Sequence, residues 1–380
     1  MDADVIIVGA GPTGLMLAGE LRLAGVRPVV LEQHAQRRDI PKAGGLGGQI
    51  LELLRYRGLL ERYEAACPGQ LPAPRFPFGG VHVDLTSLQD PPMHALPLPQ
   101  PQLEQLLEER AGELDVDIRR GRRVVGVSQD EAGVTVDARC PDGTRRLRAR
   151  YVVAGDAAHL FPATGVALNA GMLDAVNLAW KLAAAVNGQA HTGPTVNDWA
   201  HTGLLDTYHS ERHLAAARTM LHTQAQVALR RAHDPAAEAL REVFQELLTD
   251  EAPLRRMGAL IAGTDIIYPM PGASPHALSG TFAPDLRLHG ERGTTSVAEL
   301  MHTARPVLLD LADREDVREA AGGWRQRVDV HTAKTDDRPA DALLIRPDGH
   351  IAWAAAVDEP TDTSAPDLRE ALSTWFGAPR

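Results

Sequence analysis

Three glycines near the start of the chain have the spacing of a phosphate-binding turn. Gly9, Gly11 and Gly14 form the pattern GxGxxG between an apolar run at 4–8 and a stretch of helical periodicity at 13–25. In such a turn the first glycine allows a tight bend, the second lets a pyrophosphate approach the backbone, and the third lets the helix pack closely on the strand. The start of the helix adds N–H donors and a partial positive charge. The pattern predicts a dinucleotide site.

An acidic residue follows at the position that such a site requires. The next apolar run, PVVLE at 28–32, ends in Glu32. A carboxylate at this point of a βαβ unit can accept hydrogen bonds from both hydroxyls of a ribose. This favours an adenosine without a 2′-phosphate, which means FAD or NAD rather than NADP.

A second glycine-bearing turn distinguishes between these two nucleotides. An apolar strand at 146–153 runs into Gly155 and Asp156, and GVALNAG at 165–171 then opens a long helix. Ligands of open α/β sheets lie at the carboxyl ends of the strands, where Asp156 can hold ribityl or ribose hydroxyls. The N-terminal amides of the helix can face the electron-rich edge of a ring system. FAD would use both turns, whereas an NAD enzyme has no obvious need for the second, so we predict FAD.

The elements that must position these turns alternate between strands and helices, which is typical of an α/β protein with a parallel sheet. The sequence predicts a helix at 101–114, strands at 116–119, 123–129 and 133–138, and helices at 170–187, 204–232, 236–248 and 252–261. A stretch rich in proline, glycine and serine at 268–280 reads as a linker. It leads to a small C-terminal α/β unit with a hairpin that turns at Pro347, Asp348 and Gly349.

Composition and charge exclude several classes of partner. The net charge of −11 argues against a nucleic acid or an anionic membrane surface. Cys67 and Cys140 have no metal-binding or redox spacing, so we expect two reduced thiols and no metal. The one dense basic cluster, RRGRR at 119–123, is interpreted as the solvated mouth of a strand rather than a phosphate site. We find no secretion signal and no run of residues that could span a bilayer, which predicts a cytoplasmic protein.

Three segments resemble a known family. DVIIVGAGPTGLMLAGELRLAGVRPVVLE, GDAAHLFPATGVALNAGMLDAVNLAWKLAAAV and LLDTYHSERH are similar to the FAD-dependent aromatic hydroxylases of polyketide pathways. These are single-component flavoprotein monooxygenases of the type of para-hydroxybenzoate hydroxylase and rifampicin monooxygenase. The C-terminal stretch from LHGERGTTSVAEL onwards resembles the thioredoxin-like domain of such enzymes, here without CxxC. The resemblance covers nearly all of the chain.

The resemblance implies a fold, a reaction and a set of cofactor contacts. It implies a Rossmann-like FAD-binding domain at 1–187, a helical segment at 188–267, a linker at 268–284 and a thioredoxin-like domain at 285–380. It implies NAD(P)H as a transient reductant and an aromatic polyketide-like small molecule as substrate, and it assigns no catalytic residue. The cofactor contacts that it implies are Gly9, Gly11, Pro12, Thr13, Gly14, Glu32, Lys42, Gln100, Val124, Gly155, Asp156, Leu168 and Asn169.

The sequence departs from the family pattern in three places. A middle domain that usually follows about residue 153, together with an Asp-Gly motif, has no counterpart, so the strand before it and the end of the strand after it are fused. Lys42 stands where an arginine is usual, which keeps the charge but loses the bidentate fork. Ala167 replaces a glycine in a shortened loop. We therefore expect weak FAD binding and an exposed flavin face that a homodimer or a partner subunit could cover.

These departures leave two other functions open. The same scaffold could serve a redox-neutral cyclase or isomerase, in which the cavity shapes a reactive intermediate. Alternatively, the chain could be a non-catalytic relative that acts as an interaction subunit. The main prediction remains an FAD-binding oxidoreductase of natural-product biosynthesis.

Overall fold

The computed structural model describes residues 1–37, 39–67, 75–154, 161–162, 166–188, 203–231, 234–270, 276–291 and 293–380. The chain divides into two compact units. Unit 1 comprises Met1–Leu51, Glu61–Ala179 and Arg212–Asp265, and unit 2 comprises Glu52–Leu60, Trp180–Glu211 and Ile266–Arg380. Each unit has its own core and is described separately.

Unit 1 is built on a four-stranded parallel sheet. Its strands are β1 (Val5–Val8), β2 (Pro28–Glu32), β7 (Asp117–Arg120) and β11 (Tyr151–Ala154), in the order β11-β1-β2-β7. The register brings the last residues of β1 and β11 together, because Val8 is paired with Ala154. The two glycine-bearing turns of the sequence therefore leave neighbouring strands at the same edge of the sheet.

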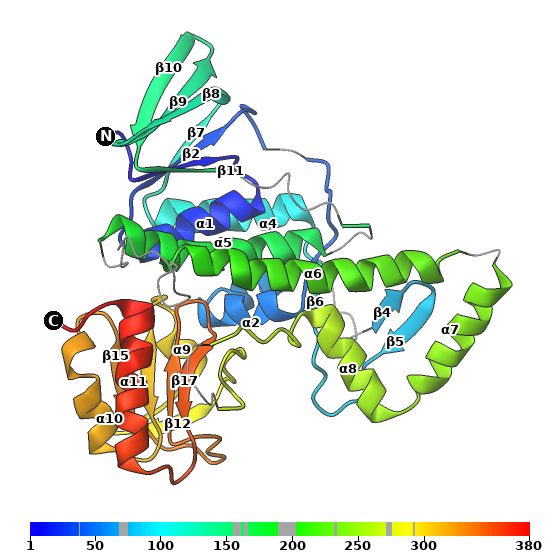
Figure 1. The fold of residues 1–380 in the computed structure, drawn as a ribbon. Coiled ribbons are helices and arrows are strands. Elements are labelled where there is room, and N and C mark those ends of the chain that lie inside the picture. The colour runs from blue at the N-terminus through cyan, green and yellow to red at the C-terminus, as the bar shows by residue number, and fades with distance from the viewer. Residues whose placement is uncertain are drawn as a thin grey trace. The chain divides into compact units, whose positions relative to one another are not determined.

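Helices cover one side of this sheet and a second sheet covers the other (Figure 1). Helices α1 (Pro12–Leu23) and α4 (Gln100–Glu113) pack together, and α1 lies against β1 and β2. The second sheet is antiparallel, with β8 (Arg123–Asp130), β9 (Gly133–Cys140) and β10 (Gly143–Ala149) in the order β10-β9-β8. Apolar side chains from both sheets form one core between them, among them Ile6, Val29, Leu31, Val134, Val136 and Leu147.

The single strand predicted at 146–153 is two strands in two different sheets. Strand β10 ends at Ala149 in the antiparallel sheet, and β11 begins at Tyr151 in the parallel sheet. Between them the N–H of Arg150 donates to the carbonyl of Asp4 at 3.1 Å, which fixes the crossing of the chain. Periodicity could not reveal this break, because the residues on both sides of it alternate toward the same core.

The rest of unit 1 surrounds a short hairpin. Strands β4 (Arg75–Phe78) and β5 (Val81–Asp84) pair with each other and pack on α6 (Asp206–Leu229), α7 (Pro235–Leu247) and α8 (Glu251–Ala262) through a separate apolar cluster. The other elements are β3 (Leu46–Gly47), β6 (Ala95–Leu96), α3 (Leu60–Ala65) and the first part of α5 (Ala167–Val186), while α2 (Gln49–Tyr56) runs on into unit 2. The four helices predicted after residue 170 are thus all present.

Unit 2 contains a mixed four-stranded sheet in the order β15-β14-β16-β17. Strand β14 (Val307–Asp310), helix α10 (Glu315–Ala320) and the parallel strand β15 (Asp329–Thr332) are followed by the antiparallel hairpin of β16 (Ala342–Ile345) and β17 (Ile351–Ala355) and by α11 (Thr361–Phe376). Strands β12 (Arg287–Gly290) and β13 (Gly293–Ser296), helix α9 (Val297–Leu300) and the 3-10 turn Gly322–Trp324 complete the unit. A βαβ unit followed by a ββα unit is the thioredoxin-like arrangement that the resemblance implied.

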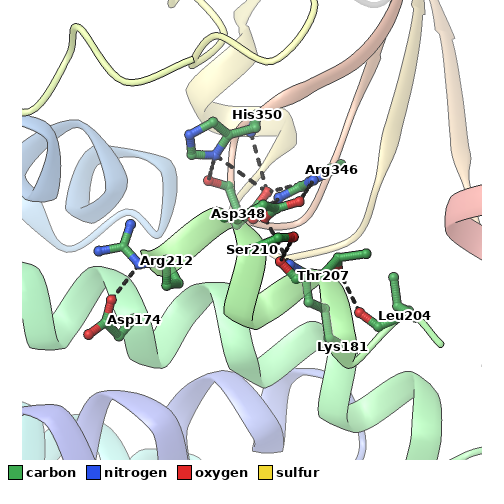
Figure 2. A network of polar contacts seen from close by, with 10 residues as sticks. Asp174, Lys181, Leu204, Thr207, Ser210, Arg212, Arg346, Asp348 and His350 are labelled. Carbon is green, nitrogen blue, oxygen red and sulfur yellow. Dashed lines mark hydrogen bonds and ion pairs between the residues drawn. The ribbon is translucent and has the colours of Figure 1, made fainter. Parts of the chain in front are cut away.

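A cluster of four buried charges lies inside unit 2. Lys181 donates to Glu211 at 2.8 Å, and Arg346 donates to both oxygens of Glu211 at 2.7 and 2.8 Å. Arg346 also donates to Asp348 in the β16–β17 turn (Figure 2). The two cations and two anions balance, which is how buried charges are tolerated.

The surroundings of this cluster shift its protonation equilibria. Burial lowers the pKa of Lys181 to about 8, and the nearby charge of Arg346 acts in the same direction. Burial alone would raise the pKa of Glu211, but attraction to Arg346 and Lys181 outweighs it and lowers that pKa to about 2. The carboxylate is therefore ionised throughout the neutral range, whereas the ammonium group titrates just above it.

Candidate functional site

The turn between β1 and α1 has the backbone that the three glycines predict. Gly9 has a φ of +109°, which side chains disfavour, and its N–H donates to the carbonyl of Leu31 at 2.8 Å. A Cβ atom at Gly14 would lie 2.1 Å from the carbonyl oxygen of Gly9, so only glycine lets α1 approach this closely. Gly11 is the residue just before the helix, and no atom of the residues that the structure describes lies within 4 Å of a Cβ built there. A ligand can therefore reach the backbone at Gly11.

Glu32 ends β2 beside this turn. Its two carboxylate oxygens accept hydrogen bonds from the backbone N–H of Ala10 at 2.9 Å and of His34 at 2.8 Å. These bonds fix the position of the carboxylate and leave lone pairs on both oxygens. The carboxylate can thus still accept hydrogen bonds from the hydroxyls of a bound sugar.

A cavity of about 190 Å³ opens at this edge of the sheet. It brings together five predicted residues that are far apart in the sequence, namely Gly9, Gly11, Glu32, Lys42 and Gln100. The other residues that line it are Ala10, Gln33, His34, Gln36, Arg37, Glu104 and Arg120. The wall thus combines backbone N–H groups, two carboxylates and several cations, a set that suits a nucleotide with hydroxyls and phosphates.

Several of these lining residues were not predicted from the sequence. Arg120 belongs to the RRGRR cluster, which the sequence analysis interpreted as a solvated strand end, yet its side chain faces the cavity and pairs with Glu108 at 2.8 Å. Arg37 pairs with the same carboxylate at 3.3 Å. The signal that could have found Arg120 is its place at the end of β7, the strand next to β2.

The second turn lies only partly within the described residues. Gly155 and Asp156 lie outside the described residues, so their role toward a cofactor stays a prediction. The strand before them, β11, supports it, because its last residue pairs with the last residue of β1. Helix α5 begins close to the first turn, since a Cβ at Gly171 would lie 2.7 Å from the hydroxyl oxygen of Thr13 on α1. The amino ends of the two helices are thus neighbours.

The first turn of α5 carries Leu168 and Asn169, both half-buried. The side-chain oxygen of Asn169 is buried, and none of the described residues donates a hydrogen bond to it. A buried acceptor without a donor is costly, and a bound group could supply the missing hydrogen bond at Asn169. Pairing of Arg212 with Asp174 joins α6 to the same part of α5 (Figure 2).

Val124 and Pro12 do not line the cavity, and neither do the predicted contacts Thr13, Gly14, Leu168 and Asn169. Val124 is in β8, half-buried against the core between the two sheets of unit 1. Pro12 is buried in the first turn of α1, next to Thr13. Their roles toward a cofactor stay predictions that rest on the resemblance.

Two family models match the chain. The model of an FAD binding domain matches residues 2–154 and 152–223, and that of the C-terminal part of aromatic-ring hydroxylases matches residues 276–379. The chain belongs to the FAD-binding aromatic-ring hydroxylases. The family agrees with the site, because FAD is a dinucleotide with a ribose, a pyrophosphate and an extended ribityl chain, and the residues described above fit such a group.

Relatives within the hydroxylase family match over the whole chain. A 12-dehydrotetracycline 5-monooxygenase/anhydrotetracycline 6-monooxygenase of Streptomyces rimosus is 32% identical, with 100% of each chain covered. The solved structure of the OxyS anhydrotetracycline hydroxylase from Streptomyces rimosus matches with a TM-score of 0.89 at 32% identity and covers 100% of both chains. A dialkyldecalin synthase of Streptomyces rugosporus is 30% identical, with 99% of each chain covered. These matches confirm the predicted family, the α/β fold and the FAD-dependent monooxygenase class.

The alignment with the tetracycline enzyme is longer than this chain. It runs over 519 positions, whereas this chain has 380 residues. At least 139 residues of the relative therefore have no counterpart in this chain. The two segments that match the FAD binding domain meet at residues 152–154. Within the described residues, none of the helices combines the length and the apolar character needed to cross a bilayer.

Proposed function

We propose that this hydroxylase binds FAD in an extended form across the two turns, takes electrons from NAD(P)H and hydroxylates an aromatic polyketide-like small molecule. The observation that carries the proposal is that the amino ends of α1 and α5 are neighbours. The amino end of α1 lies beside the cavity, and the amino end of α5 carries Asn169, whose buried side-chain oxygen has no donor among the described residues. A single extended flavin nucleotide would satisfy both places.

The residues of the chain have separable tasks in this proposal. The turn at Gly9 and Gly11 receives the pyrophosphate, and Glu32 accepts hydrogen bonds from the ribose. Asp156 holds the ribityl chain, while Leu168 and Asn169 face the pyrimidine edge of the ring system. Bound FAD supplies the redox chemistry, in which one atom of O₂ enters the substrate and the other leaves as water at the expense of NAD(P)H. The chain itself therefore positions the reactants and excludes water, and we assign it no acid or base.

The substrate class follows from the relatives and not from the cavity. The name of the tetracycline enzyme describes oxygenation of 12-dehydrotetracycline and anhydrotetracycline, and it supports the aromatic polyketide-like substrate that the resemblance implies. We propose accordingly that the chain acts in the tailoring of a natural product.

The absent segment has consequences for this chemistry. The additional alignment positions and the meeting point at residues 152–154 support the view that the usual middle domain is missing after about residue 153. Strand β11 is an edge strand of its sheet. A flavin site that is open to water loses reducing equivalents to peroxide, because the reactive oxygen species requires an enclosed site. We propose that a second copy or a partner subunit encloses the flavin during turnover.

The test is to purify the full chain, saturate it with FAD and follow NAD(P)H oxidation in air with a panel of aromatic polyketides. Substrate-stimulated oxidation, with one atom of ¹⁸O from ¹⁸O₂ in the product, is the expected result. A wild-type chain that binds no FAD at millimolar concentration would refute the proposal.

One relative supports a second candidate function. The dialkyldecalin synthase is named for the product that it forms and not for a monooxygenation, which favours a redox-neutral cyclase as the alternative on this scaffold. In that case the product would contain no ¹⁸O, and turnover would proceed without consumption of NAD(P)H. The same assay therefore separates the two functions.

A further inference from the structure

Helix α4 presents two polar side chains to the cavity, one turn apart. Gln100 is the first residue of the helix, and Glu104 follows it on the same face. The amide nitrogen of Gln100 donates to a carboxylate oxygen of Glu104 at 2.7 Å. Glu104 is only 8% exposed, so this pair is held inside the wall rather than on the surface.

The chemistry of this pair fixes the orientation of the glutamine amide. An ionised carboxylate can only accept hydrogen bonds, so the group of Gln100 that faces Glu104 must be the nitrogen. The main chain at Gln100 is also fixed, because its N–H donates to the carbonyl of Ala43 at 3.1 Å. With the nitrogen engaged, the amide oxygen remains as the acceptor of Gln100. Without Glu104, the amide could turn over and exchange its oxygen for its nitrogen.

We propose that Glu104 is a positioning residue for cofactor binding, which acts by turning the amide oxygen of Gln100 toward a hydroxyl donor of FAD. This inference rests on the proposed function, since it assigns a role within the same nucleotide site. It explains why a buried carboxylate lines a cavity that must also receive a negatively charged ligand. The carboxylate acts on the ligand through the glutamine.

A matched control lies on the same helix. Gln105 and Glu109 form an equivalent pair at 3.0 Å with the same spacing of four residues, but both are exposed and neither lines the cavity. A substitution at Glu109 therefore removes the same kind of bond, together with an ion pair to Arg62 at 2.8 Å, without altering a residue of the cavity wall.

The experiment measures the dissociation constant of FAD by quenching of flavin fluorescence in the full chain. Four proteins form a cycle: wild type, Glu104→Ala, Gln100→Ala and the double variant. We expect Glu104→Ala to weaken FAD binding about tenfold in the presence of Gln100, the size of one hydrogen bond to an oriented acceptor. In the Gln100→Ala background the same substitution should change the affinity less than about twofold. Glu109→Ala should leave the affinity of wild type unchanged.

The outcomes separate the alternatives. Equal weakening in both backgrounds would overturn the proposal, because Glu104 would then contact FAD directly or act through the fold alone. If Glu104→Ala does not fold, Glu104→Gln serves as the test variant. The new side-chain amide in this variant can both donate and accept, so it no longer fixes which end of the Gln100 amide faces it. We expect Glu104→Gln to weaken FAD binding about threefold when Gln100 is present and to have no effect in the Gln100→Ala background. Unchanged affinity in Glu104→Ala overturns the role of Glu104 and leaves the proposed function standing. A wild-type chain that binds no FAD overturns both.

Discussion

The two glycines Gly11 and Gly14 should respond to the same substitution in opposite ways. A methyl group at Gly14 would lie 2.1 Å from the carbonyl oxygen of Gly9, about 1 Å closer than real contacts allow. Alanine in a helix is ordinarily about 1 kcal/mol better than glycine, but overpacking of this kind costs about 1–3 kcal/mol. We expect Gly14→Ala to lower the free energy of unfolding by about 1 kcal/mol and to displace α1 from the turn.

Gly11 has room for the same methyl group in the free protein. No atom of the described part of the chain lies within 4 Å of the added Cβ, and the φ of −79° at Gly11 suits alanine. The unfolding free energy of Gly11→Ala should therefore stay within about 1 kcal/mol of wild type. The methyl group would instead occupy the approach of the pyrophosphate. Loss of about two charge-assisted hydrogen bonds, at about 1.5 kcal/mol each, should weaken FAD binding roughly a hundredfold.

Two measurements test this contrast on the same samples. Urea unfolding of the apoprotein gives the stability, and titration with FAD gives the affinity. If Gly11→Ala binds FAD like wild type, the pyrophosphate does not lie at this turn and the proposed site is wrong. If Gly14→Ala is as stable as wild type, the close packing of α1 on the turn does not constrain this residue.

Two further substitutions test other parts of the site and of the fold. Lys42→Arg restores a bidentate fork on the cavity wall and should tighten FAD binding about fivefold at low ionic strength; equal or weaker binding would show that Lys42 is not a phosphate contact. The pKa of Lys181 is lowered to about 8 from 10.5, so the unfolded state binds more protons between these values and stability must rise with pH there. Between pH 7.5 and 9.5 the unfolding free energy of wild type should therefore rise by about 2 kcal/mol more than that of Lys181→Met, measured by urea unfolding followed by tryptophan fluorescence; identical slopes would contradict the lowered pKa.

The sequence predicted those parts of the site that follow from a local motif or from the geometry of a parallel sheet. The GxGxxG turn, Glu32 at the end of β2 and the neighbouring ends of β1 and β11 could all be predicted, because each follows from a local pattern and from the geometry of a parallel sheet. Lys42 and Gln100 could be placed near this turn only by the resemblance, since one lies in a loop and the other starts α4, and the positions of both depend on tertiary packing.

Other features were beyond the reach of pattern reasoning. At the break between β10 and β11 the backbone N–H of Arg150 donates to the carbonyl of Asp4, and the types of these two residues carry no signal of such a break. The buried charge of Glu211 lies in a stretch that reads as an ordinary polar helix, and its partners come from distant segments. Burial of such a residue is decided by the assembled core and not by its neighbours in sequence.

The position of β11 explains how a shortened chain can keep a nucleotide site. All of β11 pairs with β1, residue by residue, so the sheet edge to which we assign the pyrophosphate is formed before the place where the two matched segments of the FAD binding domain meet. The chain then reaches α5, whose first turns already touch α1. In the proposed function, a middle domain lost at this point would remove only what lies beyond β11 and would leave the contacts of the ADP half in place. We therefore expect affinity for FAD to be separable from the coupling of electrons to substrate, because only the coupling depends on what encloses the flavin ring.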